Sequence, residues 1–280
     1  MGTRIGAAAW GFRDLMLEDQ LIICNKLGFS CLELGIANAC NDIPLDVTDV
    51  ALKEVVELYQ KYGIHLVCAA TGNDFTLSNL YEIKENVDKV KRVIDICESI
   101  GVLFLRIFAG FSPVEEVIGE RWEHMVLALN EVADYARERN VTIAIETHGG
   151  VNGFEDGVEH FASVSTKPDA LKKLLMELND NVMFVFDPAN LAAAGEKDIR
   201  IQYGLLKERI AYMHVKNFKL LSSGRLDPAT AEEGIFDWKK FFEQCGVCDV
   251  DYVVEYEKTE SIEQGSKECI KSLRKWGIKE

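Results

Sequence analysis

The sequence predicts an α/β protein built as a (β/α)₈ barrel, the TIM-barrel architecture, in which eight parallel strands alternate with helices. Two observations lead to this prediction. Eight short runs of apolar and β-branched residues recur along the chain, and longer segments with the spacing of amphipathic helices separate them. The 280 residues divide into eight units of about 35 residues, enough for one strand, one helix and their connections.

Each predicted strand is a short run that is apolar almost throughout. Continuous apolar runs indicate strands covered on both faces, as in a parallel sheet whose crossover helices lie outside it. The predicted strands are residues 4–10, 31–36, 65–71, 102–108, 141–147, 182–187, 211–216 and 252–257.

The segments between these strands have helical spacing, and several end at a glycine. Glycine readily adopts the left-handed conformation that follows the last helical turn. Such glycines are Gly28, Gly63, Gly101 and Gly246, and helices are expected for example at 47–62, 80–100, 121–139, 168–178 and 261–276.

We interpret residues 1–280 as a single domain, because no linker, low-complexity tract or change of composition interrupts the chain. The rival architecture is an open, doubly wound sheet. Such a sheet usually has a glycine-rich turn after its first strand, and "AAAWGF" (7–12) is not one. No G-x-G-x-x-G or phosphate-loop sequence occurs elsewhere. A closed barrel is therefore favoured.

The composition excludes several classes of partner. The formal net charge of −15 works against binding nucleic acid, since that binding depends on neutralising phosphates. The eight scattered cysteines are expected to be reduced thiols. No segment approaches eighteen apolar residues, and the N-terminus lacks a basic region followed by an apolar one. We therefore expect a cytoplasmic protein with no membrane partner.

Four consecutive predicted strands end with an acid or a histidine. Strand five, in "IAIETHGG" (143–150), ends at Glu146, and the next three deliver Asp187, His214 and Glu255. The carboxyl ends of neighbouring barrel strands meet at one mouth, so these side chains should converge there. Three clustered carboxylates repel one another unless a cation compensates them, and three oxygens with one imidazole suit a divalent metal ion. We expect one such ion, with Mn²⁺ as first choice and Zn²⁺, Co²⁺ or Mg²⁺ as alternatives.

Each of these residues has a simpler interpretation when taken alone. Asp187 precedes Pro188 and could merely start a turn, and His214 could be a hydrogen-bonded core histidine. Four such residues at consecutive strand ends are hard to explain by chance. The cluster, rather than any single member, predicts the metal site.

The sequence resembles the sugar phosphate isomerase/epimerase family, the xylose-isomerase-like TIM barrels that include tagatose-type epimerases and hydroxypyruvate isomerases. The resemblance covers nearly the whole chain and lies in "IETHGG", "VSTKPDALKKLL", "FDPANLAAAGEKD", "HVKNFK", "EEGIFDWKKFF" and "VVEYE". It implies that a single metal is held by Glu146, Asp187, His214 and Glu255. It also implies that Glu146 and Glu255 move the proton through a metal-stabilised enediolate.

Three positions depart from the pattern of the tagatose-type epimerases. Asn152 and Asn190 stand where those enzymes have a glutamate and a histidine, and Leu220 replaces an arginine. Ketohexose epimerisation in the manner of those enzymes is therefore in doubt, whereas the metal ligands are all present.

Further residues at or just beyond the predicted strand ends are candidates for contacting the substrate. Arg106 and Lys216 could hold a carboxylate or hydroxyls, with a salt bridge to a barrel acid as the equally weighted alternative. The full set is Trp10, Glu33, Arg106, His148, Asn190 and Lys216. The remaining histidines, His65, His124 and His160, are expected to lie away from the mouth.

The predicted function is metal-dependent isomerisation or epimerisation of a sugar or small hydroxy-keto acid. A dehydratase of the same barrel family is the main alternative, because it shares the metal and the first proton abstraction. A nuclease of the endonuclease IV type and a non-catalytic sugar-binding barrel are disfavoured. The segment 217–234 is long enough to form a lid, and a homo-oligomer stays an open option.

Overall fold

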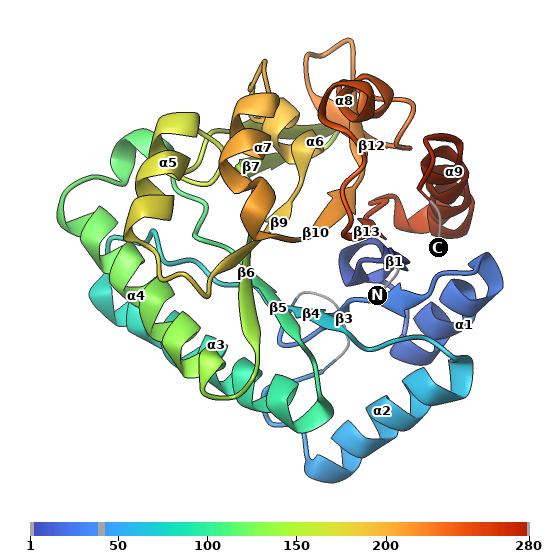
Figure 1. Cartoon of the computed structure of the whole chain (residues 1–280), viewed down its shortest axis with the longest axis horizontal. Coiled ribbons are helices and arrows are strands. Elements are labelled where there is room, and N and C mark those ends of the chain that lie inside the picture. The colour runs from blue at the N-terminus through green and yellow to red at the C-terminus, as the bar shows by residue number, and fades with distance from the viewer. Residues whose placement is uncertain (1–2, 39–42, 279–280) are drawn as a thin grey trace.

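The computed structural model describes residues 3–38 and 43–278, so Cys40 lies outside the described residues. Its main sheet is a nearly closed parallel barrel with helices around the outside (Figure 1). The strands follow the order β2-β1-β13-β10-β9-β6-β5-β4-β3. They are β1 (Ile5–Ala7), β2 (Cys31–Leu32), β3 (Leu34–Gly35), β4 (Cys68–Ala70), β5 (Phe104–Ile107), β6 (Thr142–Glu146), β9 (Met183–Phe186), β10 (Ile210–Val215) and β13 (Asp251–Val254). The predicted barrel is confirmed.

The sheet contains nine strands rather than eight because the second predicted strand is interrupted at Glu33. Its first half, β2, pairs with β1, and its second half, β3, pairs with β4. The backbone N–H of Glu33 still donates to the carbonyl of Ala7 at 2.8 Å. The interrupted strand thus brings the two ends of the sheet together.

The helices lie between successive strands, as predicted. They are α1 (Leu17–Leu27), α2 (Asp49–Tyr62), α3 (Leu80–Ile100), α4 (Glu120–Arg137), α5 (Pro168–Glu177), α6 (Pro188–Ala193), α7 (Arg200–Leu206), α8 (Trp238–Cys245) and α9 (Ile262–Lys275). Gly28, Gly63 and Gly101 end their helices in the left-handed conformation, with φ of 78°, 66° and 74°. Among the described helices, none is both long and apolar enough to cross a bilayer.

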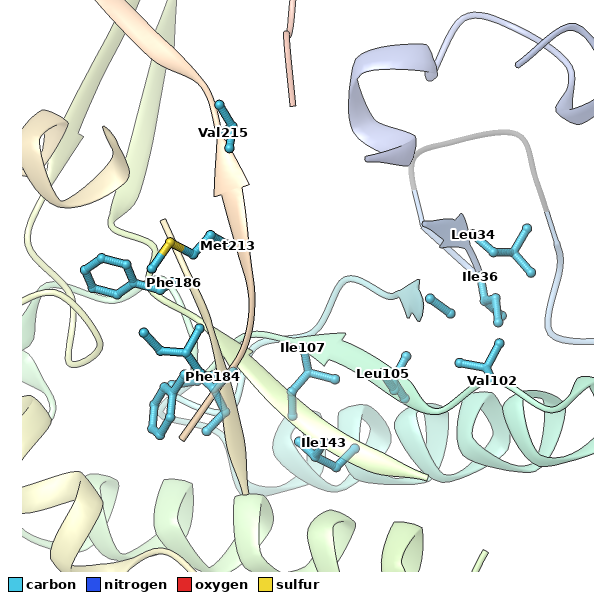
Figure 2. Packing of buried hydrophobic residues seen from close by; sticks show 14 of the residues in the cluster. Leu34, Ile36, Val102, Leu105, Ile107, Ile143, Phe184, Phe186, Met213 and Val215 are labelled. Atoms are coloured by element: carbon cyan, nitrogen blue, oxygen red, sulfur yellow. The ribbon is translucent and has the colours of Figure 1, made fainter. Parts of the chain in front are cut away.

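Alternation along each strand separates an outer core from the barrel interior. Because successive side chains point to opposite faces, Leu105 and Ile107 face the helices while Arg106 faces inward. Figure 2 shows Leu105, Ile107 and Ile143 packed between strands and helices. Burying each such side chain stabilises the fold by about 1.5–3 kcal/mol.

A second, smaller core fills the barrel interior. It consists of Ala8, Cys68, Ala144, Val185, Tyr212 and Val253. At the next inward-facing position of these strands, two residues further along the chain, the side chains are polar: Glu146 follows Ala144, and His214 follows Tyr212. The apolar plug therefore underlies a polar layer at the carboxyl ends of the strands.

An accessory sheet of four antiparallel strands forms from the segments that follow β6 and β10. Its order is β11-β12-β8-β7, with β7 (Gly150–Phe154), β8 (Gly157–Phe161), β11 (Asn217–Leu220) and β12 (Leu226–Ala229). The two hairpins are joined where Leu226 of β12 pairs with Val158 of β8. The long connection predicted at 217–234 is therefore largely a β-hairpin.

His160 of β8 makes the stability of this sheet depend on pH. Its ring lies 4.9 Å from that of Phe218, and burial is the main cause that lowers its pKa to about 3. The imidazole of an unfolded chain has a pKa of about 6.5, so the unfolded chain binds the proton first as the pH falls. The stability contributed by neutral His160 is complete above about pH 6.5 and is lost as the pH falls toward the folded pKa.

Replacing His160 with Gln removes this titration. We expect His160→Gln to lose about 2 kcal/mol less unfolding free energy than the wild type between about pH 7 and pH 5. Urea unfolding at both pH values measures this, and His65→Gln, whose side chain is exposed, is the control. Equal pH slopes in the wild type and His160→Gln would contradict the prediction.

Candidate metal centre

The four predicted ligands converge at the carboxyl ends of four neighbouring strands. Glu146 ends β6, Asp187 follows β9, His214 lies in β10 and Glu255 follows β13, and these strands are consecutive in the sheet. One ligand atom from each lies within 4.8 Å of all the others. All four side chains are buried, the most exposed at 3%.

The imidazole of His214 faces all three carboxylates. Its Nδ1 lies 3.4 Å from Glu146 Oε1, 3.5 Å from Glu255 Oε2 and 3.9 Å from Asp187 Oδ2. Neither His214 Nδ1 nor Asp187 Oδ2 has a hydrogen-bond partner among the described residues. Buried polar atoms are rarely left unpaired in proteins, so these atoms fit coordination to a cation.

Local hydrogen bonds hold Asp187 and Glu146 in place. Asp187 caps α6: its Oδ1 accepts from the backbone N–H of Asn190 at 2.9 Å, which leaves Oδ2 turned to the cluster. Asn190 Nδ2 also donates to Glu146 Oε1 at 3.0 Å, and the Thr147 hydroxyl accepts from the Asp187 N–H at 2.8 Å. The "DPAN" sequence thus forms a helix start that orients two acids.

Two buried cations flank the cluster. Arg106 Nε lies 3.3 Å from Glu146 Oε2, and its Nη2 lies 3.7 Å from Glu33 Oε2. Lys216 Nζ lies 2.6 Å from Glu255 Oε2, 2.7 Å from Glu257 Oε1 and 3.4 Å from Asp187 Oδ2. The salt-bridge alternative considered for Arg106 and Lys216 is therefore the arrangement that the structure has.

The carboxylates differ in pKa despite similar burial. Burial favours the neutral form of Glu146, but the charges of His214 and Arg106 outweigh it and lower the pKa to about 2. Burial likewise opposes ionisation of Glu255, and Lys216 holds its pKa well below the usual range. For Asp187 burial prevails and raises the pKa to about 7.

The pKa of the one imidazole in the cluster shifts upward. Burial alone would lower the pKa of His214, but the charges of Glu255 and Glu146 raise it well above its usual value. The three carboxylates thus require positive charge beside Nδ1. A divalent ion at this point would supply it and leave the imidazole neutral. Three carboxylate oxygens and one imidazole nitrogen suit Mn²⁺, Mg²⁺, Co²⁺ or Zn²⁺, so the cluster could hold a metal.

A cavity of about 530 Å³ opens above the cluster. Of the four clustered residues, the carboxylates of Glu146 and Glu255 line it, while Asp187 and His214 lie behind them. The predicted substrate contacts that also line it are Trp10, Arg106, His148 and Lys216. Glu33 and Asn190 are fully buried behind the wall, where Glu33 accepts a hydrogen bond from the Tyr212 hydroxyl at 2.7 Å.

Several cavity residues were not expected from the sequence. His160 was expected away from the mouth, which is wrong: it lies on β8 and lines the cavity, because the accessory sheet folds over the barrel. Glu257 lies two residues after Glu255, and this spacing was the available signal that both face inward. The others that line the cavity include Arg13, Phe108 and Phe111.

Solved structures share this architecture at low sequence identity. The probable 3-DHS dehydratase AsbF from Bacillus anthracis superposes with a TM-score of 0.75 at 14% identity, covering 97% of this chain and 99% of the other. The D-allulose 3-epimerase from Methylomonas sp. gives 0.74 at 14% identity, with 98% of each chain covered. A xylose isomerase-like TIM barrel protein from Mycobacterium smegmatis in complex with magnesium gives 0.72 at 14%, covering 98% and 96%.

Because the sequence identity is only 14%, these similarities are evidence for a shared fold. No curated protein matches the sequence. A family model described as xylose isomerase-like TIM barrel matches residues 21–276, which is most of the chain. The strand order, the helices around it and this match agree, and the chain belongs to the xylose isomerase-like TIM barrel family.

Proposed function

We propose that the protein is a metal-dependent isomerase or epimerase that moves a proton on a carbon next to a carbonyl group of a sugar-like substrate. The observation that supports this most directly is that only part of the cluster reaches the cavity. Glu146 and Glu255 line the cavity, and Asp187 and His214 lie behind them. A site that both binds an ion and transfers protons needs such a division.

In this proposal Glu146, Asp187, His214 and Glu255 hold one divalent ion, with Mn²⁺ as first choice. The ion would supply positive charge to the two adjacent oxygens of an α-hydroxy ketone and so stabilise the enediolate. Glu146 and Glu255 come from strands separated by β9 and β10, so they approach the cavity from different sides. One would remove the carbon-bound proton and the other would return one. Their lowered pKa values keep both ionised, the state that a base requires.

A dehydratase is the second candidate, and one feature of the cavity favours it. Lys216 and the partly buried Glu257 form an ion pair that lines the cavity beside Glu255, where a group could donate a proton to a departing hydroxyl. The family neighbours include a probable dehydratase as well as epimerases. The product separates the two: an isomer has unchanged mass, and a dehydration product has lost one water.

The ion-binding prediction is tested with chelator-treated protein titrated with Mn²⁺. We expect one ion per chain, and an affinity at least about 10²-fold weaker in His214→Ala, because a ligand nitrogen is lost. Isothermal titration calorimetry and elemental analysis measure this, with the exposed His65→Gln as control. Equal Mn²⁺ affinity in the wild type and His214→Ala would refute the proposed ion site.

Lys216 provides a second test, because its ammonium contacts the two oxygens, of Asp187 and Glu255, that the ion would use. Two cations close together repel, so Lys216→Met should bind Mn²⁺ at least about tenfold more tightly. Without the ion the same variant leaves carboxylates unpaired and should lose about 3–5 kcal/mol of stability.

Calorimetric titration and urea unfolding measure these opposite effects. Lys258→Met, which removes a part-exposed ion pair with Asp227, is the matched control and should change stability by about 0–1 kcal/mol. Weaker ion binding by Lys216→Met would contradict the interpretation that Lys216 and the ion compete for the same carboxylate oxygens.

The proton-transfer prediction concerns Glu146 and Glu255. In D₂O, metal-loaded protein should deliver deuterium to the carbon next to the carbonyl of a substrate ketone. Glu146→Gln and Glu255→Gln each keep an oxygen for the ion but lose the base, which should lower the rate about 10²–10⁴-fold. Mass spectrometry measures the exchange, with metal content determined in the same samples.

The control is Glu159→Gln, an exposed carboxylate of β8, which should exchange at the wild-type rate. Wild-type exchange in both glutamine variants would count against the proposed roles. Failure of fully metallated protein to exchange any of a panel of ketoses, inososes and hydroxy ketones would refute the proposed function.

A further inference from the structure

The cavity above the cluster is polar at its floor and apolar along one wall. The wall consists of Phe108 and Phe111, which follow β5, together with Val151, Val158 and Pro228 from the accessory sheet. The two phenyl rings pack with centroids 4.7 Å apart. None of these five side chains can accept or donate a hydrogen bond.

The charged side chains of the floor already have partners. Arg106 pairs with Glu146 and Glu33, and Lys216 pairs with Glu255 and Glu257. The guanidinium of Arg13 donates to the backbone carbonyls of Trp10 and Glu257 at 2.9 and 3.1 Å. Each arginine and lysine that lines the cavity among the described residues is therefore in an ion pair or a hydrogen bond with the protein, although Arg106 Nε has no hydrogen-bond partner.

The charges also balance once the proposed ion is included. Three basic side chains and a divalent ion face five carboxylates, so the site carries no net charge when the carboxylates are ionised. The carboxylates are Glu33, Glu146, Asp187, Glu255 and Glu257. A substrate phosphate or carboxylate would add an uncompensated negative charge to a buried site, which is costly.

Hydroxyl groups beyond the reacting carbons would also lack partners along the wall. A hydroxyl buried without a hydrogen bond weakens binding by about one to two powers of ten. The polar exceptions on this side are two imidazoles, His148 and His160, whose rings lie 6.1 Å apart. His148 Nδ1 already lies against the backbone carbonyl of Gly149, so the two rings offer few free nitrogens to a row of substrate hydroxyls.

We propose that the substrate is an uncharged α-hydroxy ketone whose remaining carbons are largely apolar: deoxygenated, alkyl or aryl rather than a row of hydroxyls. The hydroxy ketone lies at the floor, and the apolar remainder packs against the Phe108, Phe111, Val151, Val158 and Pro228 wall. This inference rests on the proposed function, because it assumes that the reacting carbons of the substrate lie at the floor beside Glu146 and Glu255.

The test uses the full chain loaded with Mn²⁺ and measures deuterium exchange in D₂O on four matched compounds. They are a ketohexose, its terminally deoxygenated form, a phenyl-substituted hydroxy ketone and a ketohexose with a terminal phosphate. We expect kcat/KM to be at least about tenfold higher for the phenyl compound than for the ketohexose, with the phosphate the poorest. A ketohexose preferred over both less hydroxylated compounds would overturn the inference and leave the proposed function standing.

Variants of the wall make the test independent of the panel. Phe111→Asn and Val158→Asn place an amide in the wall and should lower the phenyl-to-ketohexose ratio of kcat/KM about tenfold. Phe154→Asn, at an exposed position of the same hairpin outside the cavity, should leave the ratio unchanged. Circular dichroism confirms that each variant is folded. An unchanged ratio in both folded wall variants would refute the inference, whereas absence of exchange on every compound would refute the proposed function itself.

Discussion

Repulsion between carboxylates buried at one end of the barrel is the constraint to which the rest of the site responds. Glu146, Asp187 and Glu255 come close together with almost no solvent to screen them. Arg106 and Lys216 compensate part of this charge from either side. The uncompensated negative charge acts on His214, where Glu255 and Glu146 raise the pKa of the imidazole well above its usual value, whereas burial is the main cause of the raised pKa of Asp187. A divalent ion is the simplest way to compensate this charge.

The barrel can hold these charged side chains close together because rigid neighbouring strands fix the position of each backbone. Parallel register places Glu146 opposite Val185, two residues before Asp187, and His214 opposite Val253, two residues before Glu255. The outer core of Leu, Ile and Val side chains then holds the strands against their helices. Precise positioning of polar groups by rigid elements, rather than by loops, is what a catalytic or binding site requires.

The eight barrel strands and the four clustered residues could be predicted from the sequence because both follow short-range patterns. An apolar run that ends at Glu146 or Asp187 signals a buried strand that delivers an acid. The accessory sheet could not be predicted this way. Its strand "GVNGF" (150–154) is exposed after Gly150, contains two glycines and has no clear alternation, so it becomes a strand only through pairing with β8. The position of His160 over the cavity also depends on the pairing of β8 with β12, which lies far along the chain, and the interruption at Glu33 depends on closing the ring.

The accessory sheet comes from two separate connections, and its two hairpins are joined by the pairing of Leu226 with Val158 and by the packing of His160 on Phe218. The four clustered residues, in contrast, lie in the barrel strands or directly after them. We therefore expect substitutions in residues 150–161 and 217–229 to change the cavity wall more than the positions of the acids and the histidine. Relatives with the same chemistry could in this way diverge in what they accept, and exchange of the two hairpins between such relatives is a direct route to redesigning selectivity.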